Sequence, residues 1–239
     1  MSTEGKGYVI AIDGPVAAGK GTVAKRLAQD LHGFNLQTGA TYRALALACK
    51  EHGVSFRDPE NVLGVLSQIT IFLDDTGVYL GGKDVTSEIK VSDISKGSSD
   101  VSVFPEVRKR MVALQQEIGQ AHIRQGKIVI AEGRDIGTRV FPESPVKIFL
   151  TASAEIRAQR RLEQLSERGE QKDYQQVLAE VRERDRQDQE RETDPLVTEP
   201  EKYGYTVVDS TLMTESETVK KIEQILKKAN LYDQHKNTR

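Results

Sequence analysis

The sequence predicts an α/β fold: a parallel sheet flanked by helices, with an inserted small antiparallel sheet and a charged helical arm. Short apolar runs alternate with helical patterns along most of the 239-residue chain, as in consecutive βαβ units. The first of these runs leads through a glycine-rich turn directly into a helix. Between about residues 61 and 115, by contrast, short β-like runs are separated only by turns. Together these observations favour one large domain that carries an insertion.

Four apolar runs supply the predicted strands of the parallel sheet. The first is followed by a break at Asp13-Gly14-Pro15 and then by a helix over residues 20–31, with apolar side chains at four-residue spacing. Because helices cover both faces of a parallel sheet, its strands are expected to be apolar throughout. The four runs are residues 8–12, 128–131, 146–150 and 206–208.

The predicted insertion, residues 61–115, contains β-like runs joined by Asp-Asp-Thr-Gly and Gly-Gly turns. Such closely spaced runs favour an antiparallel meander over a βαβ crossover. They cover residues 69–73, 78–80 and 83–85.

A densely charged helical pattern extends from Ala154 to about Arg191, with an interruption at Gly169. Most charge runs of this kind are solvated helical arms with ion pairs four residues apart. The pattern therefore predicts such an arm over these residues.

Charge and hydropathy limit the kinds of partner. The 34 basic and 36 acidic residues leave a net charge of −2, so no overall positive field attracts nucleic acid or an anionic membrane. Hydrophobic residues make up 37% of the chain, yet no apolar run approaches the roughly 20 residues of a membrane span. The N-terminal MSTEGKGYVI lacks the apolar segment of a signal peptide. We therefore expect a soluble, cytoplasmic monomer that binds neither nucleic acid nor membranes.

Cysteine and histidine usage points to neither a disulfide framework nor a zinc site. The single cysteine, Cys49, lies in an apolar-rich stretch where a buried thiol is expected. His32, His52, His122 and His235 lack metal-ligand spacing, and we expect them at the surface or at helix caps.

A phosphate-binding loop is predicted between the first strand and the first helix. Gly14-Pro15-Val16-Ala17-Ala18-Gly19-Lys20-Gly21-Thr22 fits the pattern G-x-x-x-x-G-K. Small residues let backbone N–H groups converge on phosphate oxygens, and Lys20 can reach the β and γ phosphates. The pattern indicates a nucleoside triphosphate site. Because Gly21 stands where Ser or Thr is usual, Mg²⁺ is expected to be held mainly through water and substrate oxygens.

Further motifs follow the loop in a single order. They are Gly39-Ala40-Thr41-Tyr42-Arg43, Phe104-Pro105-Glu106-Val107-Arg108, Glu132-Gly133-Arg134-Asp135-Ile136-Gly137-Thr138, Val140-Phe141-Pro142, residues 145–150 (PVKIFL), and Glu183-Arg184-Asp185 with Asp188 and Arg191. With the GKGT ending of the loop, they resemble bacterial cytidylate kinases from about residue 8 to about residue 225. The resemblance implies transfer of the ATP γ-phosphoryl group to CMP or dCMP, with Mg²⁺ accompanying ATP. It also implies a P-loop kinase core of residues 1–60, 116–153 and 174–239, a monophosphate-binding insert of residues 61–115 and a mobile lid of residues 154–173.

For ATP, the resemblance implies contacts from residues 14–22 and from the lid. Arg157 and Arg161 are one helical turn apart and would close over the ATP phosphates, which excludes water. Glu132 follows a buried strand and would bind a water of the Mg²⁺ shell, so no residue is expected to bind the metal directly.

For the acceptor, the resemblance implies a set of arginines, since phosphoryl transfer relies on positioned cations. Arg184, Asp188 and Arg191 are spaced i, i+4, i+7 and project from one helical face. Asp188 is expected on sugar hydroxyls and the arginines on phosphate. The implied CMP-binding set is Thr38, Arg43, Ser99, Arg108, Arg134, Asp135, Arg184, Asp188 and Arg191, and the implied catalytic set is Lys20, Arg134, Arg184 and Arg191.

Within that set, Ser99, Arg108 and Asp135 are expected to recognise the base. The arginine would donate to cytosine N3 and O2, and the carboxylate would accept from the exocyclic amine. Arg182 and Arg186, by contrast, are expected in surface salt bridges.

Three positions depart from the family pattern. Gln37 stands where an Asp is usual, Glu132 is one methylene longer than the commoner Asp, and Val16-Ala17 replaces Ser-Gly in the loop. None of them removes Lys20 or an arginine, so the expected effect is on metal affinity and turnover.

The alternatives are other nucleotide-binding proteins. A GTPase would need an N-K-x-D motif and a transporter ATPase an L-S-G-G-Q-like signature, and the sequence has neither. A kinase acting on UMP, dTMP or shikimate is the rival enzyme, and the antiparallel insertion argues for the cytidylate type. A non-catalytic nucleotide sensor is the rival outside enzymes.

Overall fold

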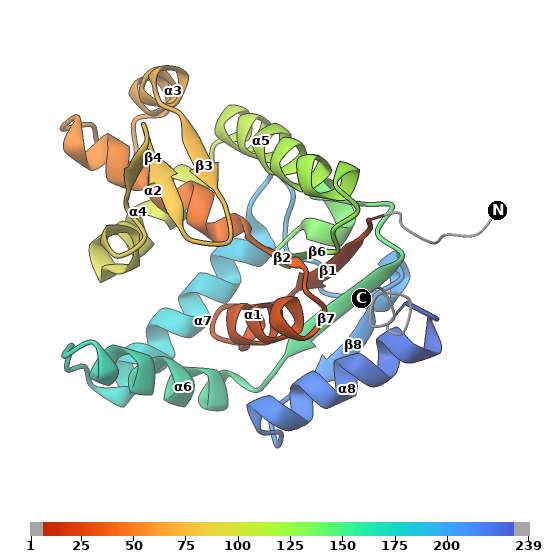
Figure 1. Cartoon of the computed structure of the whole chain (residues 1–239). Coiled ribbons are helices and arrows are strands. Elements are labelled where there is room, and N and C mark those ends of the chain that lie inside the picture. Colours follow the sequence, from red (N-terminus) through yellow and green to blue (C-terminus); the bar gives the residue numbers. More distant parts are fainter. Residues whose placement is uncertain (1–6, 232–239) are drawn as a thin grey trace.

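Five parallel strands form the central sheet of the computed structural model, which describes residues 7–231 (Figure 1). Their order is β2-β6-β1-β7-β8, and all neighbours pair in parallel. The central strand is buried along its whole length. The strands are β1 (Val9–Asp13), β2 (Phe34–Gln37), β6 (Val129–Gly133), β7 (Val146–Thr151) and β8 (Thr206–Asp209).

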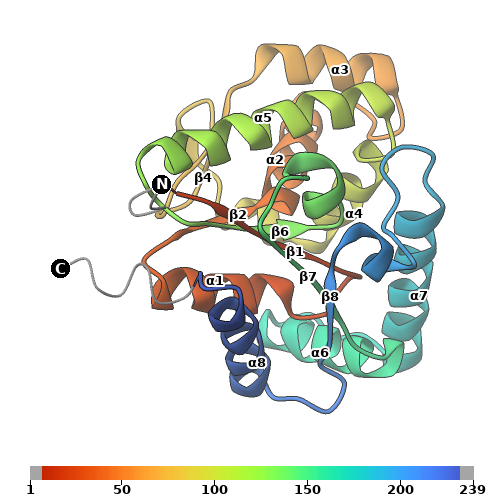
Figure 2. The same ribbon diagram turned by 90° about the vertical axis from the view of Figure 1, so that its right-hand side faces the viewer.

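Helices cover both faces of this sheet. They are α1 (Lys20–Asp30), α2 (Thr38–Glu51), α5 (Pro105–Arg124) and α8 (Glu215–Lys228). In β1, Val9 and Ala11 belong to the core shared with α2 and α5, whereas Ile10 and Ile12 belong to the core shared with α1 and α8. This alternation is the two-residue period of a strand. Figure 2 shows the resulting layers, with α2 and α5 on one side of the sheet and α1 and α8 on the other.

The four predicted strands are present as β1, β6, β7 and β8, which confirms the α/β sheet, and the helix expected over residues 20–31 is α1. The sequence pattern does not predict β2, a strand of four residues. Only Phe34 and Leu36 in it are buried, so too little apolar sequence distinguishes it from a loop. Its pairing with β6 makes it a strand.

The antiparallel insertion is also confirmed. Its strands are β3 (Ile71–Leu73), β4 (Val78–Leu80) and β5 (Lys83–Asp84), paired in that order. The helices around them are α3 (Pro59–Gln68), α4 (Ser92–Val101) and the single turn η1 (Glu88–Lys90). The sheet packs on α2 and shares its core. Because α5 runs unbroken through residue 115, no end of an element marks the boundary expected there, and the division into domains stays a prediction.

The charged arm is a pair of packed helices, α6 (Ala154–Glu167) and α7 (Tyr174–Glu190), seen side by side in Figure 1. The predicted interruption is present: Gly169 has φ +77° and lies in the turn between them. Ser153 caps α6 and Asp173 caps α7 through their side chains. An apolar seam of Ala158, Leu165, Val177, Leu178 and Val181 joins the two helices.

The remaining expectations concern cysteine, histidine and membranes. Cys49 is buried, as predicted, and burial raises the pKa of its thiol to about 11. His52 ends α2, where its Nδ1 lies 2.8 Å from the carbonyl oxygen of Ala48, whereas His235 is outside the described residues. Across residues 7–231, no helix has both the length and the hydrophobicity to cross a membrane.

Candidate active site

The phosphate loop connects the buried strand β1 to α1. Gly14 has φ +148°, and a Cβ at this position would lie 2.0 Å from the carbonyl oxygen of Leu150, so only glycine fits. Ala17 and Gly19 also have positive φ, of 57° and 91°. Left-handed residues in such a loop let successive N–H groups face one anion, and the N-terminus of α1 adds partial positive charge. The loop therefore has the backbone geometry of a phosphate site.

Lys20 lies in the first turn of α1 and is only 5% exposed. Its Nζ donates to the carbonyl oxygen of Pro15 at 2.7 Å. Burial, and then the positive charge of Arg134, lower the pKa of Lys20 to about 7. The carboxylates of Glu132 and Asp188 act in the opposite direction. Lys20 therefore lies within electrostatic reach of residues that the resemblance implies at ATP and of residues that it implies at CMP.

The protein side chains near the phosphate loop suit a metal ion that is held mostly by phosphate and water oxygens. Among residues 7–231, no group of three or more His, Cys, Asp or Glu side chains is arranged to hold a metal ion. One carboxylate does face the loop, since a Cβ at Gly21 would lie 3.9 Å from Glu132 Oε1. A single carboxylate beside a phosphate site fits Mg²⁺ that is bound through phosphate oxygens and water.

A cluster of charged side chains lies where the resemblance implies the acceptor nucleotide, and we call it the acceptor cluster. It consists of Asp188, Arg134, Arg184 and Arg191. Asp188 Oδ2 lies 2.6 Å from Arg134 Nε, and Oδ1 lies 3.2 Å from Arg184 Nε and 3.7 Å from Arg191 Nη1. Burial alone would raise the pKa of Asp188, but the three guanidinium groups together hold it well below its usual value. One carboxylate thus organises three cations, which leaves the cluster with an excess of positive charge.

Further arginines add to this excess. The pKa of Arg43 is lowered by burial and by its neighbours Arg134, Arg161 and Arg168, although Glu132 raises it. The Nε of Arg43 is buried and has no hydrogen-bond partner in the described structure. Like charges gathered in a partly buried place repel one another, and an anion relieves that repulsion. The region between core, insertion and arm is therefore suited to bind phosphate.

Arg108 and Asp135 form a buried ion pair, and Arg108 is only 1% exposed. Arg108 Nη2 donates to Asp135 Oδ2, and Nη1 donates to the carbonyl oxygen of Ser102 at 3.3 Å. The ring of Tyr42 lies 5.8 Å from the guanidinium carbon. A planar donor beside a carboxylate, next to an aromatic ring, is chemically suited to the edge and face of a base.

The two predicted hydroxyls make hydrogen bonds within the protein. Thr38 Oγ1 donates to the carbonyl oxygen of Glu132 at 2.8 Å, which ties the start of α2 to the end of β6. Ser99 Oγ donates to the carbonyl oxygen of Ser95 at 3.3 Å. Ser99 is half-buried on α4, one turn before Ser102.

The two arginines expected over ATP lie in different surroundings. Arg157 is buried, and its guanidinium is held by Asp185 at 2.6 Å and by carbonyl oxygens of Ala152 and Val16. In this arrangement its Nη1 holds the phosphate loop through the carbonyl oxygen of Val16. Arg161 is half-buried, and burial and the charge of Arg168 lower its pKa, whereas Glu170 and Glu180 raise it.

Arg160, to which sequence reasoning assigns no role, also reaches the phosphate loop. Its Nη1 lies 3.5 Å from the carbonyl oxygen of Ala18 and 3.0 Å from Ser210 Oγ. The one-turn spacing of Arg157 and Arg161 does not predict this contact of Arg160, because the contact depends on how α6 packs against the phosphate loop.

Two further acidic residues make contacts that the sequence analysis does not predict. Asp13, directly before the loop, is fully buried and accepts from the backbone N–H of Ile136 and Gly137 and from the hydroxyl of Tyr205. It thereby fixes the single helical turn η2 (Ile136–Val140) that follows Asp135. Asp194 lies after α7 and contacts Arg108. Both sets of contacts join residues far apart in the sequence, so neither carboxylate has a local signal.

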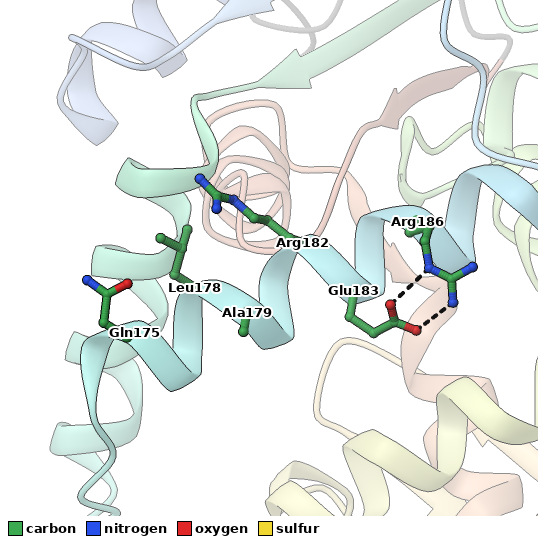
Figure 3. A pocket seen from close by; sticks show the side chains of 6 residues that line it. All are labelled: Gln175, Leu178, Ala179, Arg182, Glu183 and Arg186. Atoms are coloured by element: carbon green, nitrogen blue, oxygen red, sulfur yellow. Dashed lines mark hydrogen bonds and ion pairs between the residues drawn. The ribbon is translucent and has the colours of Figure 1, made fainter.

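A shallow pocket on α7 lies apart from these residues (Figure 3). None of the predicted site residues lines it, and its walls mix charged with apolar side chains. Arg182 pairs with Glu155 at 2.8 Å and Arg186 pairs with Glu183 and Glu190, which confirms the predicted surface salt bridges. The lining residues are Gln175, Leu178, Ala179, Arg182, Glu183 and Arg186.

Comparison with known proteins adds an independent observation. The family model "Cytidylate kinase" matches residues 10–228. A cytidylate kinase of Caldanaerobacter subterraneus subsp. tengcongensis is 44% identical over 92% of this chain and 94% of its own length. Cytidylate kinases of Enterobacter sp. (strain 638) and Mycobacterium leprae (strain Br4923) are each 40% identical, over 95% and 92% of this chain and 96% and 95% of their own lengths. The chain therefore belongs to the cytidylate kinase family.

Proposed function

We propose that this enzyme is an ATP:CMP phosphotransferase, which transfers the γ-phosphoryl group of ATP to CMP or dCMP and releases ADP with CDP or dCDP. Its place is in pyrimidine nucleotide metabolism. The observation that carries the proposal is the pairing of two anion sites, since the phosphate loop with Lys20 adjoins the acceptor cluster around Asp188. Two phosphates brought together by separate cations are what a transfer between nucleotides requires.

On the donor side, the loop holds the triphosphate through its backbone, and Lys20 supplies the mobile charge. A lysine whose pKa is near 7 in the free protein regains its proton when phosphate oxygens replace the carbonyl of Pro15. During transfer, the bond between the γ-phosphorus and the bridging oxygen of ADP breaks, and a bond to an acceptor phosphate oxygen forms. Lys20 stabilises the charge that develops on the transferred group.

On the acceptor side, Arg134, Arg184 and Arg191 hold the phosphate of CMP, with Arg43 as a further cation. Arg134 interacts with both halves of the site, because it pairs with Asp188 and also lowers the pKa of Lys20. Asp188 orients the arginines, and its carboxylate accepts from the sugar hydroxyls. Positioned guanidinium groups are suited to this role because they present fixed, paired donors.

Mg²⁺ bound with ATP would neutralise charge on the β and γ oxygens. In our proposal, Glu132 binds a water of the metal's shell and no residue binds the ion directly. The glycine at position 21 leaves room beside Glu132 for that water.

The base lies at Arg108 and Asp135, with Ser99 and Thr38 at the edges of the same site. Arg108 donates to cytosine N3 and O2, and Asp135 accepts from the exocyclic amine. Uracil presents a carbonyl at that position, which would face the carboxylate without a proton between them. Selectivity then comes from repulsion as well as attraction.

The arm closes the site from the side of the insertion. Arg168 donates to the carbonyl oxygen of Lys90 at 3.0 Å, and Ser92 donates to Glu170, so the turn between α6 and α7 touches the start of α4. Water excluded by this contact would otherwise hydrolyse ATP. In our proposal Arg161 contributes positive charge toward the ATP phosphates, and Arg157 acts through the loop.

We further propose that the enzyme works as a monomer in the cytoplasm. A net charge of −2 gives no overall attraction to nucleic acid or to an anionic membrane, which supports small nucleotides as the partners. Light scattering of the purified chain, with and without nucleotides, tests the monomer.

The decisive experiment incubates the protein with ATP, Mg²⁺ and each nucleoside monophosphate in turn, and follows ADP. We expect rapid ADP release with CMP and dCMP and a much smaller rate with UMP or dTMP. Turnover confined to another monophosphate would assign a different kinase. Nucleotide binding without any turnover would assign a sensor.

A further inference from the structure

The loop after α7 brings a second carboxylate to the base site. Asp194 Oδ2 lies 3.2 Å from Arg108 Nε, and its Oδ1 lies 3.4 Å from Arg139 Nε. Its carbonyl oxygen accepts from Arg191, with Nε at 2.8 Å. One residue therefore contacts an arginine of the base site through its side chain and an arginine of the acceptor cluster through its backbone.

Asp194 makes these contacts from an unfavourable backbone conformation. Its φ is +49°, in the left-handed region, and the next residue is Pro195, which restricts its conformation further. Such strain persists only where the surroundings hold it, and it is common at functional sites. Here three arginines and a hydrogen bond from Leu196 N to the carbonyl oxygen of Asp188, at 2.7 Å, hold the turn.

The contacts of Arg108 explain what Asp194 contributes. A guanidinium group has five N–H donors in a rigid plane. In Arg108 one donor goes to Asp194 from Nε, one to Asp135 from Nη2 and one to Ser102 from Nη1. One hydrogen on each Nη is left for a ligand. Because the plane is held from three sides, those two donors have a fixed direction before the nucleotide arrives.

We propose that Asp194 is a positioning residue for the acceptor nucleotide, whose carboxylate fixes the orientation of Arg108 while its carbonyl oxygen fixes Arg191. The inference rests on the proposed function, since it concerns the same CMP site. It adds to that site a residue outside the motifs of the phosphate loop, of η2 and of α7. ATP, held by the phosphate loop, does not depend on it.

Two substitutions separate the side chain from the backbone strain. Asp194→Gly removes the carboxylate but accepts a left-handed φ without strain, and it retains the carbonyl contact to Arg191. Asp194→Asn also tolerates that φ and keeps an oxygen for Arg108 Nε, so it removes only the charge. We expect CMP to bind about tenfold more weakly to the glycine variant and about threefold more weakly to the asparagine variant.

Control variants distinguish a specific effect of Asp194 on CMP from a general effect of charge and from a loss of stability. Glu192→Gln changes an exposed acid two residues away, and Arg139→Gln removes the exposed partner of Asp194; both are expected to leave CMP binding within about twofold. ATP binding is expected to stay within about twofold in every variant. If Asp194 were purely structural, its replacement would instead lower the melting temperature and weaken the binding of both nucleotides together.

A double-mutant cycle identifies the route of the effect. Calorimetry measures CMP binding to the parent, Asp194→Gly, Arg108→Gln and the double variant. If Asp194 acts through Arg108, the glycine substitution costs less than about twofold once Arg108 is replaced. An undiminished loss in the Arg108→Gln background, or parent-like CMP binding by Asp194→Gly, overturns the proposal. Failure of the parent to phosphorylate CMP would instead refute the proposed function, because that assay involves no variant.

Discussion

The phosphate loop and the acceptor cluster lie side by side but are built from different parts of the chain. The loop is one continuous segment, residues 14–22, and offers mainly backbone N–H groups with a single buried lysine. The acceptor cluster joins Arg134 to three residues of the α7 region, with Asp188 in its centre. The loop needs little more than local sequence, whereas the cluster exists only when β6 and α7 are brought together.

The buried aspartates of the two regions also differ in pKa. Asp13, directly before the loop, has its pKa raised to about 6, mainly by burial. Asp188 is buried as well, yet three arginines hold its pKa well below the usual value. Buried residues of one type are therefore stabilised by different means, by hydrogen bonds from N–H and O–H donors in one region and by ion pairs in the other. The difference teaches that the donor side depends on shape and the acceptor side on charge.

The largest effect is expected from Lys20→Ala, because the loop has no second cation to follow the migrating charge. We expect kcat to fall at least about a thousandfold, or about 4 kcal/mol in transition-state stabilisation. Lys25→Ala, on an exposed position of the same helix, is the matched control. Steady-state assays with ATP and CMP provide the measurement, and a variant within about tenfold of the parent would remove Lys20 from its role.

The centre of the acceptor cluster gives the next largest effect. Asp188→Asn leaves three arginines without their shared counter-ion, so we expect CMP to bind about a hundredfold more weakly while ATP changes little. Calorimetric titration of each nucleotide alone measures the two effects separately. Glu183→Gln, exposed on the same helix, is the control. Equal losses for both nucleotides would make Asp188 structural, and the contrast between the regions would disappear.

A smaller effect is expected in base selection. Asp135→Asn gives position 135 both a donor and an acceptor, so the amide can turn to suit cytosine or uracil. We expect the ratio of kcat/KM for CMP over UMP to fall at least about tenfold, or about 1.4 kcal/mol. Glu143→Gln, exposed beyond η2, should not alter the ratio. An unchanged ratio in Asp135→Asn would mean that this carboxylate does not recognise the base.

The smallest effect concerns pH. Asp13 has a folded pKa near 6 and an unfolded pKa near 3.8, so the native state binds its proton more tightly. Its contribution to stability therefore falls as pH rises between these values, and the cost of a buried charge is fully present above pH 6. The hydroxyl of Tyr205 reduces that cost through its 2.6 Å hydrogen bond.

Tyr205→Phe should accordingly destabilise the protein more at pH 7.5 than at pH 5, by about 1 kcal/mol, because a hydrogen bond to an ionised acceptor is stronger. Urea denaturation at the two pH values measures the difference. Tyr203→Phe removes an exposed hydroxyl two residues away and should show no such dependence. A loss for Tyr205→Phe that is equal at both pH values would contradict an ionised Asp13.

The sequence by itself determined the features that short-range patterns encode. Four strands, the antiparallel insertion and the break at Gly169 follow from apolar runs and turn residues. The phosphate loop follows from the spacing of its glycines and Lys20, because all its groups belong to one segment. The shared face of Arg184, Asp188 and Arg191 follows from the 3.6-residue period of a helix.

Only the tertiary structure decided which distant groups meet. Asp13 and Tyr205 are separated by 192 positions, and Arg108 contacts Asp194 across 86, so neither pair has a local signal. The short strand β2 needs β6 as a partner, and Arg157 and Arg160 reach the phosphate loop only because of how α6 packs. Helical and strand periodicity is a property of neighbouring residues, whereas an ion pair depends on the path of the chain between its members. That is why the phosphate loop can be predicted from one short segment, while the acceptor cluster depends on the fold.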